Sequence, residues 1–166
     1  HGTTLEFTAD DSANGKPAHL TKIISPNTSN TLQFTYETQA QTSQILQRKL
    51  LRITDSFGRE ISFSYDDEDY NQGVSSISDF SNRTFQYDYD TTGRLLSVTS
   101  PAVSSPDNIN NFVSGKKYEY QYLDSTNNVL KYALKAVIFP NQVADSTNTP
   151  RYAWTYDENS QGAGNS

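Results

Sequence analysis

The chain has 166 residues, of which 34% are hydrophobic, and its formal net charge is -6. This length is that of one ordinary domain, and the acidic balance argues against nucleic acid as a partner because phosphate binding needs clustered basic side chains. The absence of Cys excludes a disulfide framework and thiolate metal sites, and no apolar run reaches the roughly 18 residues that would predict a membrane span.

Strands with one aromatic face are predicted wherever large apolar residues alternate with polar ones. The 11 Tyr, 8 Phe and 1 Trp support this, because aromatic side chains suit half-buried sheet surfaces. Each alternating segment follows a shorter apolar run, which indicates successive β-hairpins. In chain order the paired segments are 20–25 with 31–37, 50–55 with 60–66, 74–79 with 84–90, 95–100 with 117–123, and 134–139 with 151–157.

The hairpins are copies of one unit. Residues 50–66 align without a gap on residues 74–90, at an offset of 24 residues. Gly58 then meets Asn82 in the turn, and these are the residue types that most readily adopt a positive φ. The position after each of them is an arginine, Arg59 or Arg83. The sequence therefore predicts an internal repeat of about five units.

The repeat defines the expected domain boundaries. One β domain is predicted over residues 1–157, with a flexible tail over 158–166. Residues 3–10 match the second strand of a further, partial unit, and the chain contains no Met. We therefore expect the chain to have been trimmed or excised from a longer array.

The segment YDTTGRLLSVTSP, residues 89–101, resembles the Tyr-Asp signature of Rhs or YD repeats. That signature continues from Tyr-Asp through two variable residues to Gly-Arg-Leu and a short apolar strand. The segments ITDSFGREISFSYD and ISDFSNRTFQYDYD are similar to the intervening part of the repeat. Only the link from Asp90 through Gly93 and Arg94 carries the full signature.

The resemblance implies a fold and a class of function. In this family, β-hairpins form a ribbon that spirals into a hollow shell, as in bacterial Rhs proteins, the cocoon of ABC toxins, wall-associated proteins and teneurins. The implied protein is large, and is either exported or displayed on the bacterial cell surface. Its partners would be other segments of the same array, or further copies through self-association.

Asp88 and Asp90 are the first candidates for chemistry, because they stand two residues apart beside tyrosines. A glycosidase needs two carboxylates that converge across a bond, with the pKa of one raised by burial. Two aspartates on the exposed face of one strand do not meet that condition. We expect Asp90 instead to flank a three-residue turn and to pair with Arg94 across it.

The acidic connection at residues 65–73 has the composition of a cation site. Asp67, Asp69 and Asn71 occupy alternate positions, and Ca²⁺ prefers several oxygen ligands from one short loop. The alternative is a solvated link between two units, and the spacing does not match an EF-hand. We favour the link, and the sequence calls for no cofactor.

Nucleophilic catalysis finds little support in the sequence. His1 and His19 are the only histidines, and neither lies in a metal-binding or triad motif. We therefore expect the protein not to be an enzyme. Exposed aromatic residues such as Tyr120 and Trp154 could instead stack on sugars, although rings repeated in every unit more often build a wall.

Together these patterns predict an all-β fold of successive antiparallel hairpins, forming a curved sheet or a segment of a β-spiral shell. The favoured function is a structural wall or assembly surface within a large extracellular protein. The alternative is an extracellular module that recognises a glycan or a protein through its aromatic faces.

Overall fold

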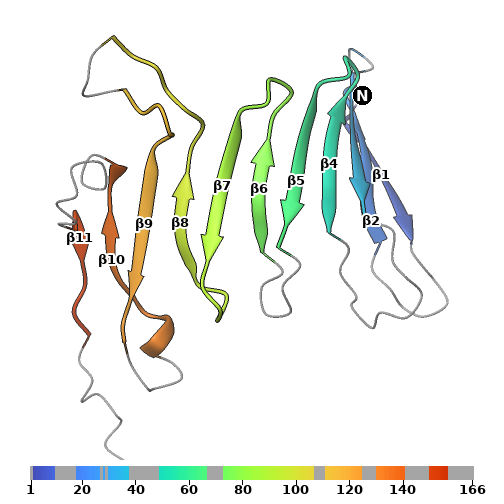
Figure 1. The fold of residues 1–166 in the computed structure, drawn as a ribbon. Helices are drawn as coiled ribbons and strands as arrows, with labels where there is room; N and C mark the ends of the chain where they lie inside the picture. The colour runs from blue at the N-terminus through green and yellow to red at the C-terminus, as the bar shows by residue number, and fades with distance from the viewer. Residues whose placement is uncertain are drawn as a thin grey trace, which may run out of the picture. The chain divides into compact units, whose positions relative to one another are not determined.

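The computed structural model describes residues 2–9, 18–26, 28, 30–37, 49–66, 73–106, 111–124, 130–140 and 150–156. In these residues the fold is all-β, which confirms the predicted class: 11 antiparallel strands follow one another in the order of the chain (Figure 1). The strands are β1 Thr4–Ala9, β2 Ala18–Ile24, β3 Thr31–Tyr36, β4 Leu50–Asp55, β5 Glu60–Tyr65, β6 Val74–Ser78, β7 Thr84–Tyr89, β8 Leu95–Thr99, β9 Lys117–Tyr122, β10 Leu134–Ile138 and β11 Tyr152–Ala153.

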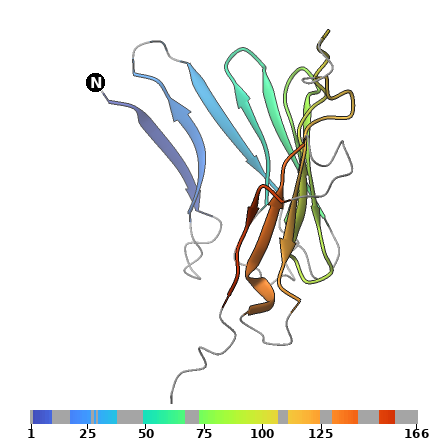
Figure 2. The same ribbon diagram turned by 90° about the vertical axis from the view of Figure 1, so that its left-hand side faces the viewer.

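The strands belong to two compact units. Unit 1 is His1–Asp67 with Gln72–Phe85, and unit 2 is Glu68–Asn71 with Gln86–Ser166, so the boundary falls within β7. The short 3-10 helix η2, Leu130–Tyr132, lies between β9 and β10 in unit 2 (Figure 2). Over the residues just given, no helix is long and apolar enough to cross a membrane.

One face of each unit is apolar, because residues paired across neighbouring strands point to the same side of a sheet. In unit 1 the apolar pairs are Leu5–Ile23, Ile23–Leu32, Phe34–Ile53, Ile53–Ile61 and Phe63–Ile77. In unit 2 they are Tyr87–Val98, Val98–Tyr118, Tyr120–Val137 and Val137–Tyr152. The predicted aromatic face thus extends across the first strands of the repeats as well as the second.

Few of the described side chains are fully buried. Ala136 and Ile138 on β10 are the buried hydrophobic ones, and Ser97 on β8 is the buried polar one. Many large apolar side chains of the sheet remain half exposed instead. Stability must therefore come largely from backbone pairing and from contacts that recur in each hairpin, rather than from a deep core.

A one-residue bulge recurs at the same place in every repeat. The partner of Leu50 is Tyr36, whereas the partner of Arg52 is Thr35, so Leu51 has no opposite residue. The corresponding unopposed residues in the other repeats are Thr21, Ser75, Leu96 and Lys135. Because a bulge adds one residue to one strand, it brings side chains three apart in sequence, such as Leu50 and Ile53, onto the same face.

Connections of different length close with the same hydrogen bond. After the tyrosine that ends a repeat, the next backbone N–H donates to the carbonyl of the residue that precedes the following strand. The four bonds are Glu37 to Lys49 at 2.8 Å, Asp66 to Gly73 at 3.2 Å, Asp90 to Arg94 at 2.9 Å and Leu123 to Ala133 at 3.0 Å. The register of the strands is therefore kept whatever the length of the connection.

Candidate functional site

The turn between β4 and β5 is built around the carboxylate of Asp55. Its Oδ1 accepts hydrogen bonds from the backbone N–H groups of Phe57 and Arg59, both at 2.9 Å. Its Oδ2 accepts from the Arg59 guanidinium, with Nε at 2.7 Å and Nη2 at 2.6 Å. One aspartate thus satisfies two backbone donors and fixes the arginine that follows the turn.

Two further turns repeat this arrangement. Asp79 accepts from the N–H of Ser81 at 2.8 Å and of Arg83 at 3.0 Å, and its Oδ2 binds the Arg83 Nε at 2.7 Å. Asp90 accepts from the N–H of Thr92 at 2.8 Å and of Arg94 at 3.0 Å, and its Oδ2 binds the Arg94 Nε at 2.5 Å. The expected pair of Asp90 and Arg94 is present across a three-residue turn.

The residue before each arginine adopts the left-handed backbone conformation. Its φ is 78° at Gly58, 59° at Asn82 and 80° at Gly93. This is the geometry of a three-residue hairpin loop, in which a turn is followed by a residue of positive φ. Asn82 can replace glycine here because asparagine tolerates this region better than most residues.

The longer connection between β8 and β9 is closed by the same type of backbone hydrogen bond as the Asp–Arg turns. Gly115 has a φ of 87°, and the backbone N–H of Ser100 donates to the carbonyl of Lys116 at 2.9 Å. The Ser100 hydroxyl accepts from the N–H of Lys116 at 3.0 Å, as the aspartate does in the shorter turns. Ser100, Gly115 and Lys116 therefore take the positions of Asp, Gly and Arg, with the intervening residues inserted between the first and the second.

In four of the repeats, the closing tyrosine donates its hydroxyl to a backbone carbonyl beside the bulge. The bonds join Tyr36 to Leu20 at 2.9 Å, Tyr65 to Leu50 at 2.9 Å, Tyr122 to Leu95 at 3.0 Å and Tyr156 to Leu134 at 2.7 Å. Each acceptor immediately precedes the unopposed residue of its strand. The hydroxyl thus satisfies a backbone carbonyl where the regular pairing is interrupted.

In three of these repeats, the residue that precedes the acceptor leucine packs on the ring of the tyrosine that donates to that leucine. His19 meets the ring of Tyr36 edge to face, with the centroids 5.0 Å apart. Lys49 Nζ lies 5.3 Å from the Tyr65 ring centroid, and the Arg94 guanidinium lies 5.1 Å from that of Tyr122. These cation–π contacts join the start of one hairpin to its far strand.

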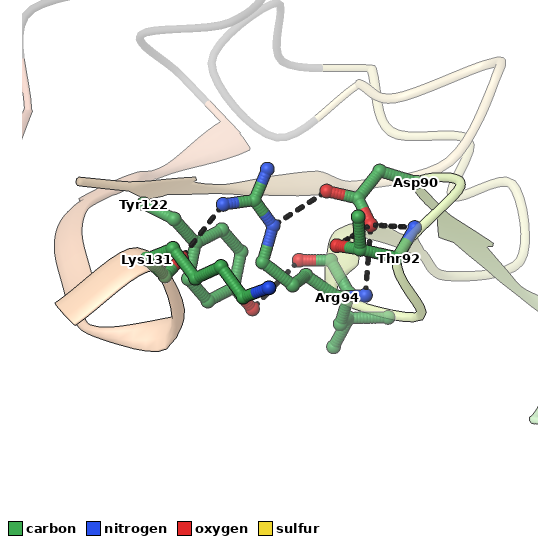
Figure 3. A network of polar contacts seen from close by, with 6 residues as sticks. Asp90, Thr92, Arg94, Tyr122 and Lys131 are labelled. Carbon is green, nitrogen blue, oxygen red and sulfur yellow. Dashed lines mark hydrogen bonds and ion pairs between the residues drawn. The ribbon is translucent and has the colours of Figure 1, made fainter. Parts of the chain in front are cut away.

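Arg94 links the turn to the next part of unit 2. Figure 3 shows its guanidinium between the Asp90 carboxylate and the backbone carbonyl of Lys131, with the Tyr122 ring alongside. The bond from Arg94 Nη1 to the Lys131 carbonyl is 2.7 Å, and it connects the turn before β8 to η2. Only 25% of the Arg94 side chain and 16% of the Asp90 side chain are exposed.

The electrostatics of the turns favours ionised aspartates. At Asp79 the guanidinium hydrogen bond from Arg83 lowers the pKa of the carboxyl. At Asp55, burial alone would raise the pKa of the carboxyl, but the hydrogen bonds from Arg59 outweigh this effect and lower the pKa. At Asp90, burial acts in the same way, and the hydrogen bonds from Arg94 and Thr92 outweigh it and hold the pKa below its usual value. A general acid needs the opposite shift, so these carboxylates are suited to binding the turn and not to proton transfer.

Asp88 and Asp90 bind different partners. Asp88 lies on β7 and accepts a 2.5 Å hydrogen bond from the Ser97 hydroxyl on β8. Asp90 lies one residue beyond the end of β7, and its carboxylate accepts hydrogen bonds from the turn that follows. The expectation that Asp88 and Asp90 share one exposed strand face is therefore wrong for Asp90. The two carboxylates serve different cross-strand contacts.

The possible cation site, which consists of Asp67, Asp69 and Asn71, lies outside the described residues. The predicted tail over residues 158–166 also lies outside them. Over the part of the chain that the structure describes, no three of the His, Asp and Glu side chains come together to hold a metal ion.

The aromatic candidates lie on the apolar face of unit 2. Tyr120 pairs with Val137, and the rings of Tyr152 and Trp154 stack with their centroids 6.3 Å apart. Trp154 is 43% exposed. It continues the pairing of β11 with β10, since its backbone N–H donates to the backbone carbonyl of Lys135 at 2.8 Å. The cluster can offer stacking surface, but its backbone also holds the edge of the sheet.

Comparisons with known proteins leave the family open, since neither the scan against protein-family models nor the search of curated proteins gives a match.

Proposed function

We propose that the chain is a non-enzymatic structural segment of a large protein, in which repeated hairpins build a wall or an assembly surface. The observation that carries this proposal is the use of the same polar residues for the same contacts in successive repeats. Asp55, Asp79 and Asp90 each bind a turn and an arginine. Residues engaged in this way at three successive turns are part of the architecture rather than a single reactive centre.

The tyrosines support the same conclusion. In the Tyr-Asp pairs and their counterparts, the hydroxyl binds a carbonyl at the bulge and the ring packs under a basic or histidine side chain. A ring held on one side and bonded at its hydroxyl has little left to offer a ligand. The aromatic periodicity is accounted for by joining hairpins.

The setting of the proposed wall rests on the sequence. The similarity of residues 89–101 to Rhs or YD repeats supports an exported or cell-surface bacterial protein. The bulge, the turn and the tyrosine contact recur along the described chain, which supports a repeat architecture. We therefore favour a segment of an encapsulating wall, with other segments of the same array as its neighbours.

An alternative function, recognition of a glycan or a protein, is favoured by the exposed stack of Tyr152 and Trp154. Screening the chain on a glycan array separates the two functions. A wall segment gives no specific binding. Specific binding that is abolished by Trp154→Ala or Tyr120→Ala, with the circular dichroism spectrum unchanged, would overturn the structural proposal.

A further inference from the structure

Two phenylalanines stand in the turns at one edge of unit 1. Phe57 follows Asp55 by two residues and Phe80 follows Asp79 directly, and they are 73% and 59% exposed. Tight turns usually carry Gly, Asn, Asp or Ser at such positions, so two large aromatic side chains here are unusual.

Arg59 ties the two rings together. Its guanidinium lies 5.6 Å from the Phe57 ring centroid and 5.8 Å from that of Phe80. The rings belong to consecutive hairpins, so this cation–π arrangement forms a continuous strip along the edge. We name the strip and the apolar residues beside it, Leu32 and Ile61, the phenylalanine edge.

The phenylalanine edge is hollowed on either side of Leu32. One hollow of about 340 Å³ lies against Ile23, Leu32 and Phe57. A second of about 330 Å³ lies against Leu32, Ile61 and Phe80. Each is shallow and open, and each is large enough to receive a bulky apolar side chain from a partner.

The charges of this surface cancel locally. Arg59 is paired with Asp55, and Arg83 with Asp79, within their own turns. The neighbouring Glu60 lies 3.5 Å from Arg52. The chain as a whole has a net charge of -6, so two copies repel each other over most of their surface, but this edge presents no net charge to a second copy.

From these features we infer that the phenylalanine edge is a contact between two copies of the chain, related by a twofold axis. A twofold interface must be complementary to itself, and a strip of rings and guanidinium groups meets this condition because the rings of one copy can cover the arginines of the other. The hollows beside Leu32 would receive the Phe side chains of the partner.

The apolar area is of a suitable size. Leu32 and Ile61 are 41% and 42% exposed, beside the more exposed phenylalanines. With about 200 Å² for a large apolar side chain, the four contribute on the order of 400 Å² per copy. A standard interface buries about 800 Å² per partner, so these side chains supply roughly half of it. This predicts a weak dimer rather than a permanent one.

Sedimentation velocity of the full chain, from about 1 μM to about 500 μM, covers the range of a weak association. We expect the wild type to pass from monomer to dimer, and Phe57→Ser with Phe80→Ser to weaken the association at least 10-fold. The matched control is Val113→Ser, which removes a 70% exposed apolar side chain from unit 2 and should leave the dimer unchanged. Circular dichroism checks the fold, and Phe57→Lys alone provides a second test through charge repulsion.

A wild type that stays monomeric throughout overturns the inference, as does a double variant that associates like the wild type. Association weakened equally by Val113→Ser would indicate nonspecific contact and would also overturn it. The inference stands on unit 1 alone. Its failure would leave the proposed structural function unaffected, because that function is decided by the glycan array.

Discussion

At each Asp–Arg turn, one carboxylate combines two tasks that hairpins often divide between several residues. It accepts from two backbone N–H groups, and it binds the arginine that precedes the next strand. The Asp90–Arg94 pair is the least exposed of the three, because 25% of the Arg94 side chain is exposed, against 58% for Arg59 and 67% for Arg83. Arg94 also donates to the Lys131 carbonyl. We therefore expect the network around Asp90 to contribute more to stability than the more exposed pairs at Asp55 and Asp79.

Replacing Asp90 with Ala removes these hydrogen bonds and leaves Arg94 without its carboxylate. Since hydrogen bonds to charged groups contribute about 1.5 to 3 kcal/mol, we expect the free energy of unfolding to fall by about 2 kcal/mol. Urea unfolding followed by circular dichroism measures the change. Asp124→Ala, at an exposed position of unit 2, is the control and should have little effect.

The same carboxylate makes stability depend on pH. Its pKa in the folded chain lies below the usual value of about 3.9, so the unfolded chain binds more protons as the pH falls below about 4. The contribution is therefore present above pH 4 and is lost on acidification. We expect unfolding free energies measured between pH 6 and pH 2 to decline less steeply for Asp90→Asn than for the wild type. Equal slopes would show that the carboxylate is not preferentially ionised in the fold.

The tyrosine hydroxyls offer a second test at the residue scale. Tyr65→Phe keeps the ring under Lys49 but removes the 2.9 Å bond to the Leu50 carbonyl. A neutral hydrogen bond contributes about 0.5 to 1.5 kcal/mol, so the unfolding free energy should drop by about 1 kcal/mol. Tyr132→Phe, on a half-exposed ring in η2, is the comparison. Losses of the same size at both positions would argue against a special role for the bulge carbonyl.

At the scale of the hairpin, the turn glycines differ in what surrounds them. Gly58 and Gly115 have similar positive φ values of 78° and 87°. A Cβ at Gly58 would meet nothing within 4 Å, whereas one at Gly115 would clash with the Ser100 carbonyl oxygen. Both substitutions to Ala carry the left-handed penalty of about 1 to 2 kcal/mol, and Gly115→Ala adds a backbone clash.

Thermal unfolding of the two variants separates these effects. We expect Gly115→Ala to lower the midpoint clearly more than Gly58→Ala does. A larger loss at Gly58 would mean that the closure of the long connection is not held as described.

Much of the hairpin architecture follows from the sequence, because alternation and turn residues are local signals. The strands, the sites of positive φ at Gly58, Asn82 and Gly93, and the partner of Asp90 can all be predicted in this way. The bulges and the tyrosine bonds were missed, since they depend on register between strands. A signal was present in the spacing of three between Leu50 and Ile53, which a regular strand places on opposite faces.

At the scale of the whole chain, burial is uneven. Every residue of β1 whose exposure is described is exposed, while β10 contains Ala136 and Ile138 at 2% and 0% exposure. Amides exchange slowly where opening must disrupt buried contacts. In hydrogen–deuterium exchange we expect the slowest amides in β10 and its partner β9, and the fastest among the strands in β1. Uniform protection across the strands would contradict this distribution.

The central claim is that the recurring Asp, Arg and Tyr contacts build a wall that belongs to a longer array. The most direct measurement is the sequence of the reading frame on both sides of the chain. The account predicts further units there, each with apolar residues three apart and a closing Tyr, and with Asp–Arg turns in some of them. A signal peptide directly before the chain and a stop codon directly after it, with no additional unit, would contradict the account.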